Sequence, residues 1–221
     1  MIKLVMVICA ACALLLFGAA PSEAVWPMYH EPSFDGKVVD IATGKPIEGA
    51  VVVAVYNKRA LGASRGQSSL VINVKEVLTD REGKFHIPSY TTLLALPFTQ
   101  SDRTTFLIYK PGYASANLAL KSYFTGQSKT ERELSPWDDP VLSGKYKIKL
   151  WPSGVIGLPK LETKDERLRN MPSLPDKLEH LGRQKALTKL INEERRELGE
   201  AEIDPYQMRN ILLNEMKGDK R

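Results

Sequence analysis

The chain has 221 residues, of which 26% are charged and 43% are hydrophobic, and its formal net charge is +5 at pH 7. This balance predicts one folded domain of ordinary size with an appendage, and it excludes both wholesale disorder and a polytopic membrane protein. Acidic and basic residues are interspersed, and no basic block with interleaved aromatics occurs, so we expect no nucleic-acid partner. The small positive charge indicates no more than a mild attraction to anionic envelope surfaces.

Residues 1–24 have the layout of a secretory signal peptide. Lys3 precedes an apolar run from Leu4 to Ala20, and small residues follow. We expect cleavage after Ala24, with cleavage after Ala20 as the alternative. The mature chain is then periplasmic or secreted and has no stable membrane insertion. An uncleaved anchor is a competing interpretation, because the apolar run is only marginally long enough to span a bilayer.

The only two cysteines, Cys9 and Cys12, both lie in this segment. Lipidation at Cys12 is a further alternative, although Cys9 stands where lipoprotein signals usually carry leucine or a similar residue. Cleavage after Ala24 leaves a chain with no thiol, no disulfide and no thiolate metal site. Such a chain tolerates an oxidising compartment.

Strand patterns begin after a short N-terminal lead-in, residues 25–32. Residues 34–57 predict a strand, a turn-rich connection and a second strand in the β-branched run VVVAVY. The stretch VLTDREGKFHIPSY, residues 77–90, predicts a β-hairpin, because Gly83 accepts the positive φ of a tight turn. By alternation, Phe85 then faces the core and the next residue faces water.

Two further strands are predicted later in the chain. Residues 105–109 form a compact apolar run that ends at the turn sequence Lys-Pro-Gly-Tyr. In residues 145–152, apolar side chains alternate with lysines, which is typical of a half-buried final strand. A polar insertion, residues 125–144, lies between them.

The composition changes after Pro152. Residues 153–175 contain three prolines and predict a linker. Residues 176–218 predict two amphipathic helices, the second with Asp204 as N-cap and Pro205 at its first position. The apolar residues of the first helix form a stripe: Leu178, Leu181, Leu187, Leu190, Ile191 and Leu198. This stripe either folds back onto the domain or docks on a partner or on a copy of itself.

Three motifs carry a resemblance to a known family. They are FDGKVVDIATGKPIEGAVVVAVY, then VLTDREGKF, then FLIYKPGY, in that order along the chain. Residues 33–152 thereby resemble the carboxypeptidase regulatory-like domains of the transthyretin-like (prealbumin-like) superfamily. The resemblance implies a mainly β fold, a Greek-key β-sandwich of about seven strands, here followed by a C-terminal helical tail. It also implies a role that is mostly non-catalytic, as in bacterial envelope proteins and beside carboxypeptidase catalytic domains.

The sequence gives little support for catalysis. None of His30, His86 and His180 belongs to an H-x-x-E or H-E-x-x-H motif, so the zinc site of carboxypeptidases is not present. A hydrolase of the hydroxyisourate type, also in this superfamily, is a minor alternative that would require His30 and His86 to converge. Asp80 and Glu82 lack the spacing of a calcium loop and indicate a solvated turn. We therefore expect no catalytic residues, no cofactor and no metal.

A carbohydrate-binding module is the remaining alternative. Trp137, with Asp138 and Asp139, lies in the polar insertion, where an exposed indole can stack on a sugar while the carboxylates accept its hydroxyl groups. The competing interpretation is that Trp137 anchors the insertion on the domain. Trp151 is expected to serve in packing.

The leading hypothesis is a non-enzymatic extracytoplasmic module that binds or scaffolds a cell-envelope partner, either a protein or a polysaccharide. In this hypothesis the helical tail mediates packing, self-association or partner contact. We also expect that deleting residues 160–221 leaves a folded sandwich.

Overall fold

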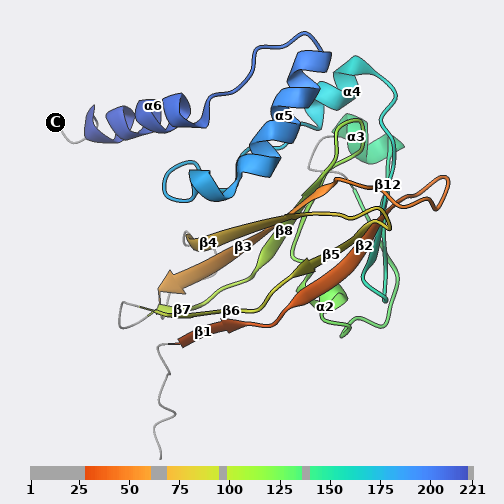
Figure 1. The fold of residues 1–221 in the computed structure, drawn as a ribbon, viewed down its shortest axis with the longest axis horizontal. Helices are drawn as coiled ribbons and strands as arrows, with labels where there is room; N and C mark the ends of the chain where they lie inside the picture. Colours follow the sequence, from red (N-terminus) through yellow and green to blue (C-terminus); the bar gives the residue numbers. More distant parts are fainter. Residues whose placement is uncertain (1–27, 61–68, 95–98, 136–139, 219–221) are drawn as a thin grey trace, which may run out of the picture.

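The computed structural model of this chain describes residues 28–60, 69–94, 99–135 and 140–218 (Figure 1). The fold is mainly β, with several sheets and a few helices. The expected signal peptide lies outside the described residues, as do Trp137, Asp138 and Asp139. Within the described ranges, no helix is both long and apolar enough to cross a membrane.

One five-stranded sheet, here called the β2 sheet, has the strand order β10–β11–β12–β2–β5. Its strands are β2 (Phe34–Asp40), β5 (Lys84–Ile87), β10 (Arg132–Leu134), β11 (Ile148–Trp151) and β12 (Val155–Leu158). β12 runs parallel to β2 and places Ile156 opposite Val38, whereas the other pairings of this sheet are antiparallel.

A second sheet, here called the β3 sheet, has the order β4–β3–β8–β9, and β7 also pairs with β3. Its strands are β3 (Val51–Ala60), β4 (Leu70–Leu78), β7 (Thr99–Ser101), β8 (Thr105–Tyr109) and β9 (Ala116–Leu118). A small third sheet pairs β1 (Met28–Glu31) with β6 (Tyr90–Leu93).

The two large sheets bury a common apolar core. The ring of Phe34 from β2 meets that of Phe106 from β8 edge to face, with centroids 4.9 Å apart. Phe124, at the end of the short helix α2 (Lys121–Phe124), contacts both Phe106 and Phe85 of β5. Such edge-to-face pairs add to the stabilisation that burial itself provides. The core position predicted for Phe85 is confirmed, since that side chain is buried and His86 is exposed.

The helices cover the other face of the β3 sheet. Figure 1 shows α4 (Lys164–Arg169) and α5 (Lys185–Glu197) on this side of the molecule, with the single turn η1 (Leu181–Arg183) before α5. Apolar side chains of η1, α5 and the segment before them form a second buried cluster with the β3 sheet: Val51, Val53, Val55, Val74, Leu107 and Tyr109 from the strands, and Leu174, Leu181, Leu187 and Ile191 from this helical segment. The predicted stripe therefore folds back onto the domain.

The first predicted tail helix begins later than expected. Residues 176–180 are not helical, because the Asp176 carboxylate accepts hydrogen bonds from the backbone of Leu178 and Glu179 and holds a local turn. The second tail helix is confirmed as α6 (Pro205–Gly218), and the Asp204 carboxylate accepts hydrogen bonds from the backbone at its start.

The predicted domain and linker boundaries differ from the structure. β1 lies before residue 33, and β12 lies inside the stretch predicted as a linker, residues 153–175. The last strand of the fold is thus β12 rather than residues 145–152. β12 was hard to recognise because Ile156, Gly157 and Leu158 are all buried, so that this short central strand shows no polar alternation.

The predicted β-hairpin over residues 77–90 is wrong. β4 pairs with β3, whereas β5 pairs with β2, so the connection from Thr79 to Gly83 crosses from one sheet to the other. The turn chemistry itself was predicted correctly: Gly83 has a φ of +73°, and its N–H donates to the Asp80 carbonyl. Local sequence defines such a turn but does not determine which sheet receives the second strand.

Candidate functional site

The three histidines have separate partners. His30 lies on β1 and bonds to the Thr91 hydroxyl, His86 lies on β5 and bonds to the Asp35 carboxylate, and His180 bonds to Asp176. Within the described ranges there is no group of three or more potential metal ligands among His, Cys, Asp and Glu. A hydroxyl group thus orients His30, whereas carboxylates orient His86 and His180.

The Asp80 loop has the contacts of a turn. The Asp80 carboxylate accepts hydrogen bonds from the backbone N–H groups of Glu82 and Lys84, and the Glu82 carboxylate pairs with the Lys84 ammonium at 2.6 Å. These oxygens are occupied in stabilising the connection between the two sheets.

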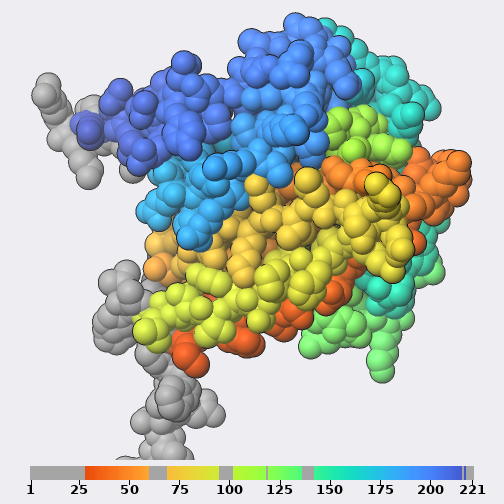
Figure 2. Space-filling model, viewed as in Figure 1, coloured from red at the N-terminus to blue at the C-terminus, as the bar shows by residue number. Residues whose placement is uncertain are grey.

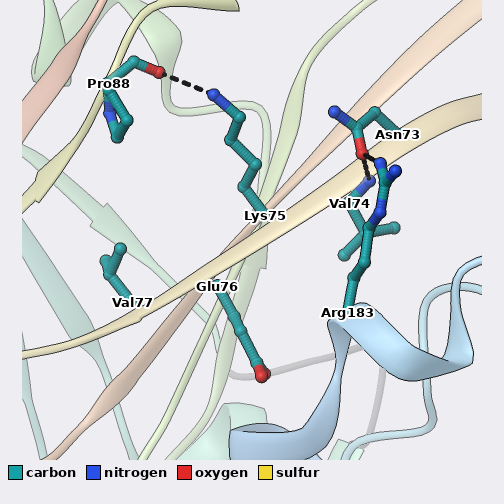
Figure 3. Close-up of a pocket in the computed structure, with 7 residues that line it drawn as sticks. All are labelled: Asn73, Val74, Lys75, Glu76, Val77, Pro88 and Arg183. Atoms are coloured by element: carbon teal, nitrogen blue, oxygen red, sulfur yellow. Dashed lines mark hydrogen bonds between the residues drawn. The ribbon is translucent and has the colours of Figure 1, made fainter.

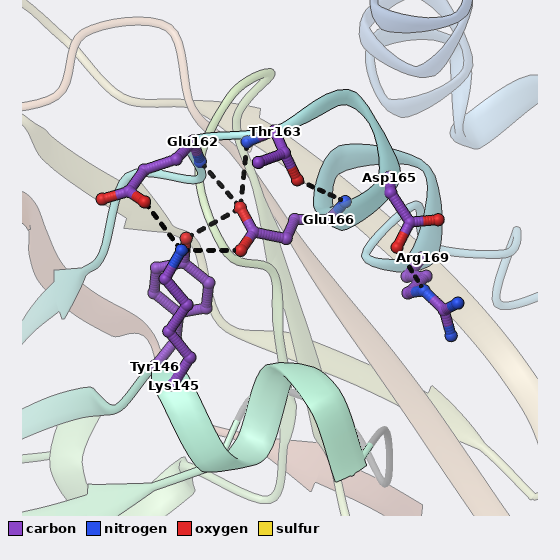
Figure 4. A network of polar contacts seen from close by, with 7 residues as sticks. All are labelled: Lys145, Tyr146, Glu162, Thr163, Asp165, Glu166 and Arg169. Carbon is purple, nitrogen blue, oxygen red and sulfur yellow. Dashed lines mark hydrogen bonds and ion pairs between the residues drawn. The ribbon is translucent and has the colours of Figure 1, made fainter.

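A carboxylate cluster beside α4 is likewise saturated (Figure 4). Glu166 accepts hydrogen bonds from the Lys145 ammonium at 2.8 Å, from the Tyr146 hydroxyl at 2.9 Å, and from the backbone N–H groups of Glu162 and Thr163. The hydrogen bond from Lys145 is the main cause that lowers the pKa of Glu166 to about 2. With its acceptor positions filled, Glu166 ties α4 to α3 (Pro140–Lys145) instead of offering a free carboxylate.

The best candidate for a functional site lies along β4, which is an edge strand of the β3 sheet. A surface hollow of about 600 Å³, here called the strand-edge hollow, follows this strand. It is lined by Asn73, Val74, Lys75, Glu76, Val77, Pro88 and Arg183 (Figure 3). Figure 2 shows β4, in yellow, at the surface. It lies between the blue C-terminal segments and the yellow-green residues that come after β4 in the chain.

The backbone of β4 presents polar groups to this hollow. Thr79, which continues the strand, donates its N–H to the Ala50 carbonyl and accepts from Gly49 N–H, so its polar groups point toward β3. In an antiparallel pair, successive residues direct their N–H and C=O groups alternately toward and away from the neighbouring strand. The backbone groups of Val74, Glu76 and Leu78 therefore point toward the open edge. The Val74 N–H is satisfied by the Asn73 side chain. Among the described strands β4 pairs only with β3, so the backbone groups of Glu76 and Leu78 face an edge that no strand covers.

The hollow is flanked by positive charge. Lys75 donates to the carbonyl oxygens of Pro88 and Ser89, and Arg183 donates to the Asn73 side chain from the opposite side. Burial, and to a lesser extent the charge of Arg183, lower the pKa of Lys75. Each cation is paired here with a neutral acceptor, so neither positive charge is neutralised by these bonds.

The one acidic side chain of the hollow is already engaged. Figure 3 shows the Glu76 side chain pointing toward the helical segment, away from Lys75. Its two carboxylate oxygens accept hydrogen bonds from Ala186 N–H at 2.7 Å and Leu187 N–H at 3.0 Å, at the start of α5. The hollow therefore combines backbone donors that point to an open strand edge with a net positive lining.

Sequence patterns alone do not reveal this site. A hairpin over residues 77–90 would place β5 beside β4, on the side of β4 that is open in the structure. The hairpin prediction therefore hides the edge. The signal that was available is Pro88, which cannot donate to a sheet and is typical of strand borders. The residues that were singled out for ligand contact, Trp137, Asp138 and Asp139, remain a prediction because they lie outside the described residues.

Comparisons with known proteins give no family for this chain. No protein-family model matches it, and no curated protein matches it. Among solved structures, catechol 1,2-dioxygenase from Acinetobacter radioresistens is similar over 65% of this chain and 55% of its own, at 16% identity and a TM-score of 0.32. 3-Chlorocatechol 1,2-dioxygenase from Rhodococcus opacus 1CP is similar over 63% of this chain and 62% of its own, at 12% identity and a TM-score of 0.28. The chain thus spans less than two thirds of either enzyme, and neither likeness carries an argument because both TM-scores are low.

Proposed function

We propose that this chain is a non-enzymatic extracytoplasmic module that binds a cell-envelope protein by adding a strand of that protein to the open edge of β4. The scaffold for this activity is a Greek-key β-sandwich of the carboxypeptidase regulatory-like type, as its sequence motifs indicate. The observation that carries the proposal is the strand-edge hollow beside an edge strand whose backbone groups at Glu76 and Leu78 point away from β3.

Strand addition needs an edge whose donors and acceptors are free and a surface beside it for side chains. β4 is nine residues long, and the hollow follows five consecutive residues of it. Val77 and Pro88 supply apolar surface on one side of the added strand. Such a geometry accepts an extended segment, whose main chain provides affinity and whose alternate side chains provide specificity.

The charge of the hollow selects the partner. Lys75 and Arg183 flank the edge, and Glu76 is occupied by the start of α5. An acidic extended segment is therefore complementary to this edge. A second copy of β4 is disfavoured, because antiparallel self-pairing would bring two sets of these cations together.

A direct test uses a fluorescein-labelled octapeptide of alternating valine and glutamate. We expect saturable binding by fluorescence anisotropy, weakened by salt because charge pairing contributes. A peptide with lysine in place of glutamate should bind much more weakly. A third peptide, N-methylated on alternate amides of one edge, should lose binding because it lacks the donors of a sheet ladder.

Matched variants of the protein place the interaction on β4. Leu78→Pro removes an N–H that points to the open edge and takes no part in the pairing with β3, so it should abolish binding while the fold persists. Leu78→Ala keeps the N–H and should bind like the unmodified protein. Equal binding by Leu78→Pro, or by the N-methylated peptide, would exclude strand addition.

Export is tested separately. A fusion of residues 1–60 to alkaline phosphatase, which is active only outside the bacterial cytoplasm, should be active, and the same fusion without residues 1–24 should be inactive. Activity that does not depend on residues 1–24 would contradict the extracytoplasmic part of the proposal.

A further inference from the structure

The outer face of the β2 sheet carries a second hollow, independent of β4. It has a volume of about 560 Å³ and is lined chiefly by Trp151, Pro152, Ser153, Val155, Lys37 and Val39. The helical segment lies on the opposite side of the molecule, against the β3 sheet.

Strand register explains why these residues share a face. Trp151 on β11 is paired with Val155 on β12, and Val155 is paired with Lys37 on β2, so the three lie in a row across three neighbouring strands. The residues beside them in sequence, Leu150 and Ile156, are buried in the core. By alternation, the row points outward.

The indole of Trp151 lies against the sheet and not in the core. A Cβ added at Gly157 would come within 2.9 Å of two carbons of the six-membered ring. The ring therefore rests on the bare backbone of β12, and its position is fixed by the glycine beneath it. Trp151 remains partly exposed, so one apolar surface of the ring faces the hollow.

The polar groups around the ring are a cation and a hydroxyl. The Lys37 ammonium has no ion-pair or hydrogen-bond partner among the described residues, and no carboxylate lines the hollow. The nearest acids along β2 are engaged: Asp35 bonds to His86, and Asp40 accepts from the backbone of Ala42 and Thr43 and from the Tyr113 hydroxyl. Lys37 is thus available for an anionic ligand.

We propose that this hollow binds a hexuronic-acid unit of an acidic polysaccharide. The apolar face of the sugar ring packs on the Trp151 indole, the carboxylate pairs with Lys37, and a sugar hydroxyl bonds to Ser153. A rigid aromatic surface with hydrogen-bonding groups at its border suits a flat, polar ring better than an aliphatic side chain. Because the hollow is open, the polysaccharide continues on both sides of the bound unit.

The probe is a trimer of α-1,4-linked galacturonate, compared with the neutral galactose trimer of the same linkage. Isothermal titration calorimetry should show binding of the acidic trimer and binding at least about tenfold weaker for the neutral one, which corresponds to the loss of one charge pairing of about 1.4 kcal/mol. Equal affinity for the two trimers, or no binding of the acidic one, would overturn the proposal.

Three variants locate the site. Lys37→Gln should weaken binding of the acidic trimer about tenfold, whereas Lys189→Gln, the same change on exposed α5, should have no effect. Ser153→Glu adds a negative charge in an exposed turn and should weaken binding without disturbing the fold. Trp151→Ala should abolish binding, and Trp151→Tyr should retain part of it. If Lys37→Gln and Ser153→Glu both bind like the unmodified protein, the hollow is not the binding site.

Discussion

Glu76 of β4 caps the first turn of α5 through Leu187: its carboxylate accepts the Leu187 N–H at 3.0 Å and, through its other oxygen, the Ala186 N–H at 2.7 Å. The N-cap residue of α5, Gln184, makes no capping hydrogen bond with its own side chain. A strand residue distant in sequence thus supplies the cap that most helices obtain locally, and its charge is favourable at the positive end of the helix.

Replacing this carboxylate should loosen the helical cover of the β3 sheet. We expect Glu76→Ala to lower the free energy of unfolding by about 1–2 kcal/mol, because two backbone donors lose their acceptor. Urea denaturation followed by circular dichroism measures the change. Glu48→Ala, at an exposed carboxylate whose pair with Arg81 is 3.9 Å long, should change it by less than about 0.5 kcal/mol. Equal effects of the two substitutions would show that the cap adds nothing.

Gly83 should tolerate substitution much less well than Gly44, although both have a positive φ. A Cβ at Gly83 would overlap the Val38 carbonyl oxygen, whereas a Cβ at Gly44 meets no atom within 4 Å. We expect Gly44→Ala to cost about 1 kcal/mol from backbone strain alone and Gly83→Ala to cost more than about 3 kcal/mol. Thermal unfolding of the two variants gives the comparison, and similar midpoints would contradict it.

Acid should weaken the contact between α3 and α4. The hydrogen bond from Lys145 is the main reason that the pKa of Glu166 falls from 4.5 to about 2. A carboxyl group with a lowered pKa stabilises the fold above its unfolded pKa, and this contribution is lost as the pH falls through the folded value.

The stability difference between the unmodified protein and Glu166→Gln should therefore be largest at neutral pH and should shrink between about pH 4.5 and pH 2. Urea unfolding at several pH values measures it. Glu133→Gln, at an exposed carboxylate paired with Lys149 at 3.4 Å, is the control and should show a small difference throughout. A constant difference for Glu166→Gln would refute the expectation.

Two truncations should behave differently. Removing residues 205–221 deletes α6, whose Tyr206 and Ile211 side chains are more than half exposed, so we expect a nearly unchanged unfolding midpoint. Removing residues 160–221 instead uncovers the buried outer face of the β3 sheet, including Val51, Val53 and Leu107. This corrects the expectation from sequence that a folded sandwich would remain: we now expect aggregation and binding of a hydrophobic dye. Cooperative unfolding of the shorter chain at the original midpoint would disprove it.

The elements that were predictable share a strong local signal. The alternation of Tyr146, Ile148 and Leu150 is confirmed by their burial, since a half-buried strand repeats every second residue. The turn at Gly83 and the N-cap at Asp204 were predicted from residue chemistry that acts within a few positions. Such features depend little on the rest of the chain.

What could not be predicted depends on partners distant in sequence. Nothing local distinguishes a hairpin from a connection between sheets, so the open edge of β4 was not anticipated. The start of α5 at Lys185 is stabilised by the Glu76 carboxylate of β4, which is distant in sequence. The hollow beside Trp151 forms only because the register of β11, β12 and β2 aligns its lining residues. The position of the Trp151 ring depends in addition on Gly157, which lies beneath it.

The parallel pairing of β12 with β2 has a consequence for the order of folding. β2 lies at the start of the domain and β12 at the end of its strands, yet the two are neighbours in the middle of the β2 sheet. A contact that joins such remote segments forms late, because closing a long loop costs entropy before the pairing repays it. While the chain is still being synthesised, β2 therefore lacks a neighbour on one side, and cooperative folding waits until Leu158 has emerged.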